Sequence, residues 1–250
     1  MSKWQELKDS GKIQDFRVIG DAVCLLGDCM DVLPFLDVVD CVITDPPYSE
    51  KTHIGARAGR GEDVLIDFDS ISDHFFLMIC RSLVNLSARW VVMTCDWRHA
   101  AHAEKEMPGE FIRAGIWVKP NGMPQFTGDR PSTGWEAVAI MHKKGKKRWN
   151  GGGSHAVWIV PKVHGNHPTE KPIFLISKFL ELFSDPGDVI FDPFMGSGTT
   201  GVAATQLGRK FIGIEREPKY FAIACERIEN AQRQENLFKN EEKPEQEILF

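Results

Sequence analysis

A glycine-rich turn between a strand and a helix restricts the fold of this chain more than any other sequence feature. The turn is Gly196-Ser197-Gly198-Thr199-Thr200-Gly201, which matches the pattern G-x-G-x-x-G. It follows an apolar strand pattern at 189–191 and leads into a helical pattern at 199–207, with Gly208 as the expected stop. Glycines at such a turn let a ligand approach the backbone at the helix N-terminus. The turn therefore predicts an α/β fold with a ligand at the carboxyl edge of its sheet.

The rest of the chain alternates between strand and helix patterns, as expected for a mostly parallel sheet flanked by helices. Further strands are predicted at 22–26, 38–44, 90–94, 115–118, 137–141 and 211–214, and further helices at 74–86, 97–106, 172–183 and 220–232. A length of 250 residues with 42% hydrophobic residues suits one domain over 1–250. Two stretches, 49–67 and 121–166, interrupt the alternation, and the charged end at 234–250 is expected to be frayed.

Hydropathy, cysteines and net charge exclude several classes of protein. No run of about 18 apolar residues predicts a membrane helix, and no apolar leader follows Met1. The 6 cysteines form no Cys-x-x-Cys pair and the 8 histidines have no convincing metal spacing. We therefore expect buried thiols in a reducing cytoplasm and no metal. The net charge of −5 argues against coating nucleic acid by bulk charge, while a local basic footprint is compatible with it.

The cofactor is indicated by what surrounds the glycine turn. Glu215 lies about 20 residues further on, at the end of the next strand, where a carboxylate can bind ribose hydroxyls. A nicotinamide dinucleotide fits this pattern as well as S-adenosylmethionine does. A dinucleotide fold continues with several strand–helix units, whereas only one clear strand and one helix follow the turn here. Asp192 adds negative charge beside the turn, which suits a sulfonium or amino group better than a pyrophosphate. We therefore expect S-adenosylmethionine, with a nicotinamide-dependent oxidoreductase as the alternative.

Another buried strand ends in the corner Asp45-Pro46-Pro47-Tyr48. The prolines must end the strand and make the loop rigid. An amine conjugated to a base ring is a poor nucleophile because its lone pair is delocalised. The Asp45 carboxylate and the Pro46 carbonyl can accept hydrogen bonds from such an amine, and Tyr48 can stack on a base that has left the duplex. The corner therefore predicts direct methyl transfer to an exocyclic amine.

Three motifs, in this order, resemble the DNA amino-methyltransferases of the circularly permuted beta class. They are Asp45-Pro46-Pro47-Tyr48, then His167-Pro168-Thr169-Glu170-Lys171-Pro172, then Asp192-Pro193-Phe194-Met195-Gly196-Ser197-Gly198-Thr199-Thr200. The resemblance covers roughly 20–230. It implies a Rossmann-like, circularly permuted methyltransferase fold that uses S-adenosylmethionine, with a small target-recognition insertion at 121–166. It also implies double-stranded DNA as the partner, is compatible with a homodimer, and suggests an enzyme of the cytoplasm at the nucleoid of a bacterial or phage-infected cell.

The resemblance assigns cofactor contacts to residues near these motifs. Glu215 would bind the ribose, and Lys171 and Pro172 would close over the methionine portion. Asp28 and Cys29 would contact the adenine, although a core thiol is an equal alternative for Cys29. The predicted cofactor-binding set is Asp28, Cys29, Asp45, Lys171, Pro172, Asp192, Pro193, Phe194, Gly196, Ser197, Gly198, Thr199, Thr200 and Glu215.

The first residue of the catalytic motif indicates the target base. In this family Asp at that position favours adenine N6, and Ser favours cytosine N4. Asp45 therefore predicts site-specific adenine-N6 methylation of DNA after base flipping, as in restriction–modification, with cytosine N4 as the alternative. A carbon-5 cytosine enzyme would need a nucleophilic cysteine, usually after proline, and no Pro-Cys pair occurs. A non-catalytic nucleic-acid-binding module is a third hypothesis, against which the complete motif set argues.

Two basic stretches are candidates for DNA contacts. The loop 49–67 follows the catalytic corner and would fold over the flipped base, and the run 143–148 offers cations to phosphates. For both, a solvated surface segment is the alternative. Three tryptophans, Trp135, Trp149 and Trp158, are expected in the core of the recognition region. The predicted DNA-binding residues are Lys51, Arg57, Arg60, Lys143, Lys144, Lys146, Lys147 and Arg148.

Overall fold

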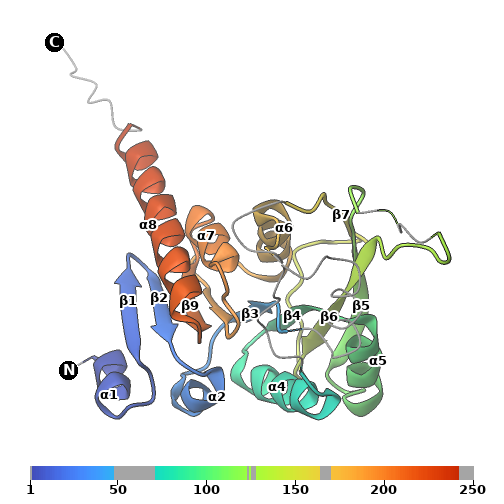
Figure 1. Cartoon of the computed structure of the whole chain (residues 1–250), viewed down its shortest axis with the longest axis horizontal. Coiled ribbons are helices and arrows are strands. Elements are labelled where there is room, and N and C mark those ends of the chain that lie inside the picture. Colours follow the sequence, from blue (N-terminus) through green and yellow to red (C-terminus); the bar gives the residue numbers. More distant parts are fainter. Residues whose placement is uncertain (1, 48–70, 123, 125–127, 164–169, 242–250) are drawn as a thin grey trace.

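A computed structural model describes residues 2–47, 71–122, 124, 128–163 and 170–241, with side chains up to 234. The strands in this part of the chain are β1 (Asp15–Ile19), β2 (Ala22–Leu26), β3 (Cys41–Thr44), β4 (Trp90–Cys95), β5 (Phe111–Val118), β6 (Trp135–His142), β7 (Val157–Ile159), β8 (Val189–Asp192) and β9 (Lys210–Glu215). They form one sheet in the order β1-β2-β9-β8-β3-β4-β6-β5-β7 (Figure 1). The strands from β2 to β4 in this order are parallel, while β1 and β6 pair antiparallel to their neighbours. The predicted fold class, a mostly parallel α/β sheet, is confirmed.

Helices cover both faces of the sheet. Their bounds are α1 (Lys3–Asp9), α2 (Cys29–Val32), the 3-10 helix η1 (Leu33–Phe35), α4 (Asp73–Leu86), α5 (Trp97–Glu106), α6 (Ile173–Phe183), α7 (Thr199–Gln206) and α8 (Pro218–Glu241). One hydrophobic cluster joins α6, α7 and α8 to one face, and a second joins α4, α5 and residues of α1 and α2 to the other (Figure 1). Alternate strand residues supply the two clusters, because successive side chains of a strand point to opposite faces. No helix in the described ranges is both long and apolar enough to cross a membrane.

The local patterns predicted most of these elements. The helix 97–106 is confirmed at both ends, and the other predicted helices are confirmed with small differences at their ends. The strand expected at 38–44 begins only at Cys41, because Val38 is exposed and Val39 forms an isolated bridge. Sequence patterns missed α1, β1, α2, η1 and β7, which are all short. The α8 helix continues to Glu241, into the range that was expected to be frayed.

The stretch 121–166 contains β6 and β7, both of which belong to the central sheet. Its described residues therefore do not form a separate unit. Trp158 packs edge-on against Phe179 of α6, with ring centroids 4.9 Å apart, and Trp149 contacts Phe183, so both join the main core as expected of core residues. The core prediction is wrong for Trp135, which is 39% exposed at the first position of β6.

The site lies where the chain changes direction across the sheet. From β3 the chain crosses through α4 to β4 on one side, and from β8 it crosses through α7 to β9 on the other. Because both crossovers are right-handed, they place α4 and α7 on opposite faces and leave a crevice at the carboxyl ends of β3 and β8. Cys41 pairs with Ile190 and Val42 with Phe191, so the two strands end side by side. The fold therefore joins two motifs that lie far apart in the sequence.

Candidate active site

Asp45 follows β3 directly and is held at the crevice by two side chains. One carboxylate oxygen, Oδ1, accepts a hydrogen bond from Thr94 Oγ1 at 2.5 Å, and Oδ2 lies 2.5 Å from Lys171 Nζ. Thr94 belongs to the neighbouring β4, and Lys171 precedes α6. Pro46 and Pro47 follow and line the same cavity. The carboxylate is thus fixed on both oxygens while its side chain remains 24% exposed toward the cavity.

Burial and charge shape the ionisation of this pair. Burial raises the pKa of Asp45 and nearby Glu136 raises it further, whereas Lys171 and Thr94 lower it. Burial opposes the charged form of Lys171, but the two carboxylates of Asp45 and Glu136 outweigh it and raise the pKa of Lys171. The lysine is therefore an ammonium at neutral pH.

The glycine turn after β8 forms the floor of the neighbouring half of the site. Gly196 and Gly198 have φ of +52° and +81°, which L side chains rarely adopt. A Cβ on Gly198 would also lie 2.8 Å from the Cβ of Ala224 in α8. The turn can therefore pack this close to α8 only with glycine. It leads directly into α7, whose first residues, Thr199 and Thr200, line the cavity, and the first N–H groups of a helix are available to a ligand.

Two acidic residues flank the turn. Asp192 Oδ1 accepts from Thr44 Oγ1 at 2.6 Å, and from the Phe194 backbone N–H at 3.1 Å. Burial raises the pKa of Asp192 to about 6, while its hydrogen bonds with Thr44 and Thr200 oppose the shift. Glu215 accepts from the backbone N–H groups of Gly196 at 2.9 Å and Glu217 at 2.8 Å. Burial raises the pKa of Glu215, and these backbone contacts counteract the rise.

One cavity of about 230 Å³ joins these groups. Of the residues predicted from the sequence, it brings together Asp28, Cys29, Asp45, Pro46, Pro47, Lys171, Asp192, Pro193, Phe194, Gly196, Ser197, Thr199, Thr200 and Glu215. Pro172 and Gly198 do not line it: Pro172 caps α6, and Gly198 caps α7 beneath the turn. Cys29 lines the cavity and also packs in the core, and its contact with the adenine stays a prediction. Lys171, expected near the methionine portion, lines the cavity and contacts Asp45, and its contact with the cofactor stays a prediction.

Sequence reasoning missed three residues that support this site. Thr94 belongs to no motif, and the sequence predicts only that it lies in the strand 90–94. Glu136 precedes the predicted strand 137–141, and nothing in its surroundings indicated that it reaches Lys171 at 3.5 Å. Arg227 of α8 donates to the carbonyl and the hydroxyl of Ser197, each at 2.8 Å, and to Glu170 at 2.6 Å. For Arg227, the sequence offers one signal: an arginine on the face of the last helix that packs against the sheet.

Several predicted residues lie outside the described part of the chain. These are Tyr48 of the catalytic motif, the loop 49–67 with Lys51, Arg57 and Arg60, and the first part of the second motif, His167-Pro168-Thr169. Their roles remain predictions. Within the described ranges, no group of three or more His, Cys, Asp or Glu side chains could hold a metal ion.

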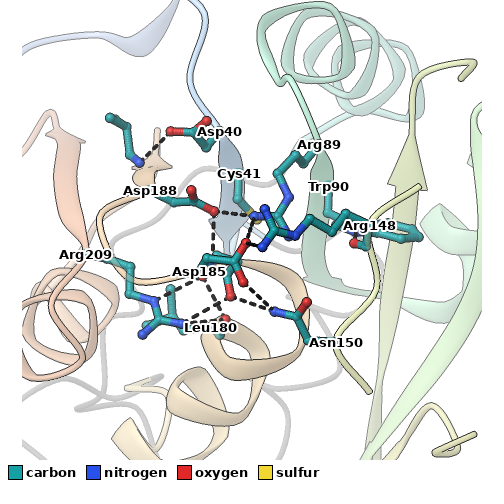
Figure 2. Close-up of polar contacts among 12 residues, drawn as sticks. Asp40, Cys41, Arg89, Trp90, Arg148, Asn150, Leu180, Asp185, Asp188 and Arg209 are labelled. Atoms are coloured by element: carbon teal, nitrogen blue, oxygen red, sulfur yellow. Dashed lines mark hydrogen bonds and ion pairs between the residues drawn. The ribbon is translucent and has the colours of Figure 1, made fainter. Parts of the chain in front are cut away.

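The basic run 143–148 lies away from the cavity. β6 runs antiparallel to β4, so its last residue, His142, pairs with Trp90 at the start of β4, and the run follows at the amino edge of the parallel strands. There Arg148 forms an ion pair with Asp185 at 2.8 Å, and Asp185 also binds Arg89 at 2.9 Å (Figure 2). The structure therefore does not bring these cations together with the catalytic corner.

Known proteins resemble this chain in sequence and in fold. The family described as DNA methylase, of the N6/N4 methyltransferases, matches residues 39–226. The type II methyltransferase M.HinfI of Haemophilus influenzae is 27% identical over 241 residues, which cover 82% of this chain and 67% of the relative. M.BglI of Bacillus subtilis is 40% identical over 96 residues, which cover 38% of this chain and 28% of the relative.

Solved structures agree with this result. The complex of M1.HpyAVI with SAM has a TM-score of 0.64 and 26% identity, and the match covers 83% of this chain and 98% of that one. The cytosine-N4-specific PvuII DNA methyltransferase has a TM-score of 0.66 at 16% identity, covering 89% and 94%. At this identity the second match concerns the fold alone.

Proposed function

This chain belongs to the family of N6/N4 DNA methylases, and from that premise we propose that it methylates the N6 amine of adenine in DNA with S-adenosylmethionine. One observation carries the proposal: the Asp45 corner and the glycine turn open into one cavity. The Thr44–Asp192 hydrogen bond of 2.6 Å joins the two strand ends on which they sit. The membership in a methylase family argues against the nicotinamide alternative, which also leaves the Asp45 corner without a role.

The residues around the glycine turn fit S-adenosylmethionine. The positive φ angles of Gly196 and Gly198 let a ligand approach the backbone closely. A carboxylate offers about four acceptor positions, so Glu215 keeps capacity for ribose hydroxyls beside its two backbone contacts with Gly196 and Glu217. Buried Asp192 places an acidic group beside the turn, as a cationic amino-acid end or sulfonium requires.

The chain's own residues orient and activate the amine. Asp45 accepts one N–H of the base amine, and the Pro46 carbonyl accepts the other, which localises the nitrogen lone pair. When bound, S-adenosylmethionine supplies an electrophilic methyl group: the amine lone pair forms the new N–C bond, the C–S pair stays on sulfur, and one N–H proton goes to water. The rigid Pro46-Pro47 corner holds both acceptors in line with the cofactor cavity, so that proximity supplies much of the rate enhancement.

The choice of adenine is supported by Asp45 at the first position of the motif. The same fold serves cytosine N4 in the PvuII enzyme, so the fold by itself is compatible with either base. The first residue of the motif therefore supports the choice of adenine, with cytosine N4 as the competing assignment.

The test is methyl transfer to mixed-sequence DNA with labelled S-adenosylmethionine, followed by nucleoside analysis. We expect N6-methyladenine, and we expect Asp45→Ala to lower the rate by roughly 10²–10⁴-fold, because it removes an acceptor acting in the transition state. Cofactor binding, measured by calorimetry, should be largely kept. The control Asp37→Ala removes a carboxylate that is 94% exposed and should change neither the rate of methyl transfer nor cofactor binding.

Each alternative has its own outcome in this experiment. N4-methylcytosine as the sole product would refute the base assignment, and methylation of RNA but not DNA would refute the substrate class. Tight NADH binding without S-adenosylmethionine binding would refute the proposed reaction.

A further inference from the structure

Beyond Asp45, a row of charged side chains crosses the carboxyl edge of the sheet. Lys171 Nζ lies 2.5 Å from Asp45 Oδ2 and 3.5 Å from Glu136 Oε2. The other oxygen of Glu136 forms an ion pair with Lys119, directly after β5. The signs alternate along the row, from Asp45 to Lys171, Glu136 and Lys119, and each member comes from a different segment of the fold.

The row is shielded from water and rests on an aromatic surface. Lys171 is 6% exposed, Glu136 16% and Lys119 17%, so their mutual interactions are screened less than those of surface pairs. The ammonium groups of Lys119 and Lys171 lie 4.7 and 5.8 Å from the ring centroid of Trp117. That ring is itself fixed by a hydrogen bond from Nε1 to the carbonyl of Val160 at 2.8 Å. Both lysines are therefore held in place from below as well as from the sides.

This arrangement solves a problem that the Asp45–Lys171 pair creates. An ammonium paired with Asp45 alone would place its whole charge beside that carboxylate and make it a weaker acceptor for the base amine. A second carboxylate on the far side of the ammonium shares its hydrogen bonds and its charge. We infer that Glu136 is a positioning residue for methyl transfer, which holds Lys171 between two carboxylates so that Asp45 keeps its strength as a hydrogen-bond acceptor for the base amine. Lys119 forms an ion pair with Glu136 and partly neutralises its negative charge.

The inference rests on the proposed function, but its direct test does not need catalysis. The full-length protein, labelled with ¹³C at Asp carboxyl groups, is titrated by NMR, and the Asp45 signal is assigned with Asp45→Asn. The charged or titratable groups that face Asp45 are Lys171, Glu136, Asp192 and Cys95. The variants described next change the charge of Glu136 or of its partner Lys119 and leave the other facing groups in place.

Two variants should move the pKa of Asp45 in opposite directions. Glu136→Gln removes a negative charge and leaves Lys171 to Asp45, so we expect a decrease of roughly 0.5–1 unit. Lys119→Met removes the cation that tempers Glu136, so we expect an increase. The control Glu104→Gln alters an exposed residue of α5 and should leave the pKa of Asp45 unchanged. Opposite shifts cannot come from general loosening of the fold, so shifts in the same direction, or none in either variant, overturn the inference.

Kinetics provide the second measurement. With labelled S-adenosylmethionine and mixed-sequence DNA, Glu136→Gln should lower kcat by roughly fivefold to tenfold and move the acidic limb of its pH profile to lower pH, since a less basic Asp45 is a weaker acceptor. The KM for S-adenosylmethionine should stay within about twofold. A wild-type protein that transfers no methyl group to DNA would refute the proposed function, while the NMR titration would still decide the role of Glu136. An unchanged kcat in Glu136→Gln, in an active enzyme, would overturn the inference.

Discussion

Asp192 shows how one residue can couple cofactor binding to pH. Its carboxyl is 3% exposed and accepts hydrogen bonds from Thr44 and the Phe194 backbone, and burial raises its pKa to about 6. A cation bound beside it favours the ionised carboxylate. Binding of S-adenosylmethionine near pH 6 should therefore release a proton from Asp192. Below about pH 6 the carboxyl is mostly neutral and must first be ionised, so the affinity for S-adenosylmethionine falls as the pH falls.

We predict that the Kd for S-adenosylmethionine rises as the pH is lowered from 6.5 to 5, approaching about tenfold per pH unit at the lower end. Calorimetry at several pH values measures it, and buffers of different ionisation enthalpy report the released proton. Asp192→Asn should bind more weakly at pH 7 and show a flat profile. The control Asp9→Asn changes an exposed carboxylate of α1 and should keep the wild-type dependence. A flat wild-type profile would contradict the coupling.

At the scale of elements, α8 does more than cover the sheet. Arg227 reaches from this helix to Ser197 in the glycine turn, to Thr199 at the start of α7 at 3.4 Å, and to Glu170 beside Lys171. One guanidinium thus connects α8, the N-terminus of α7 and the segment leading into α6. These elements supply both the cofactor half and the lysine of the catalytic half. The planar fork of arginine can serve several acceptors at once, which a lysine cannot do.

Arg227→Met is expected to weaken S-adenosylmethionine binding roughly tenfold. Losing charge-assisted hydrogen bonds costs about 1.5–3 kcal/mol, and part of this loss makes the glycine turn less well held for the cofactor. Arg227→Lys should recover only part of the affinity. The matched control is Arg233→Met on the same helix, which removes a 68% exposed arginine paired with Glu229 at 2.9 Å. Calorimetry on the three variants decides the matter: equal Kd values for Arg227→Met and Arg233→Met would exclude the connecting role.

For the whole molecule, the two edges of the sheet have different tasks. The carboxyl edge carries Asp45, Asp192 and Glu215. The amino edge carries a structural ion network, in which Arg89 pairs with Asp185 and Asp188 (Figure 2). At roughly 3.3 Å per residue, the length of β4 separates the edges by about 17 Å. DNA that delivers a base to Asp45 must approach the carboxyl edge, so the basic run 143–148 faces away from the expected path.

We therefore predict that neutralising the run leaves DNA binding nearly unchanged. The variant Lys143→Gln, Lys144→Gln, Lys146→Gln and Lys147→Gln should keep the Kd for mixed-sequence DNA within about twofold and keep its salt dependence. The comparison variant, Lys51→Gln, Arg57→Gln and Arg60→Gln, changes the stretch after the catalytic corner and should weaken binding and lower the slope. Fluorescence anisotropy over a series of salt concentrations measures both. If the first variant lowers the slope by about 3–4, the run contacts phosphates after all.

The sequence by itself determined the fold class and the identities of the two site halves. Strand and helix periodicity, the double proline after Asp45 and the glycines at 196 and 198 are local features whose physics acts within a few residues. Short elements such as β1 and β7 were not predictable, because segments of 5 and 3 residues carry too little periodic pattern.

Only the tertiary structure decided which side chains meet at the site. Thr94, Glu136 and Arg227 reach it from β4, β6 and α8, and no local pattern distinguishes them from other polar residues of their elements. The basic run 143–148 illustrates the same limit in reverse: its charge was visible in the sequence, but the antiparallel direction of β6 placed it at the opposite edge. Strand order and strand direction are properties of long-range pairing, so they set the neighbours of Asp45 only once the whole sheet has formed.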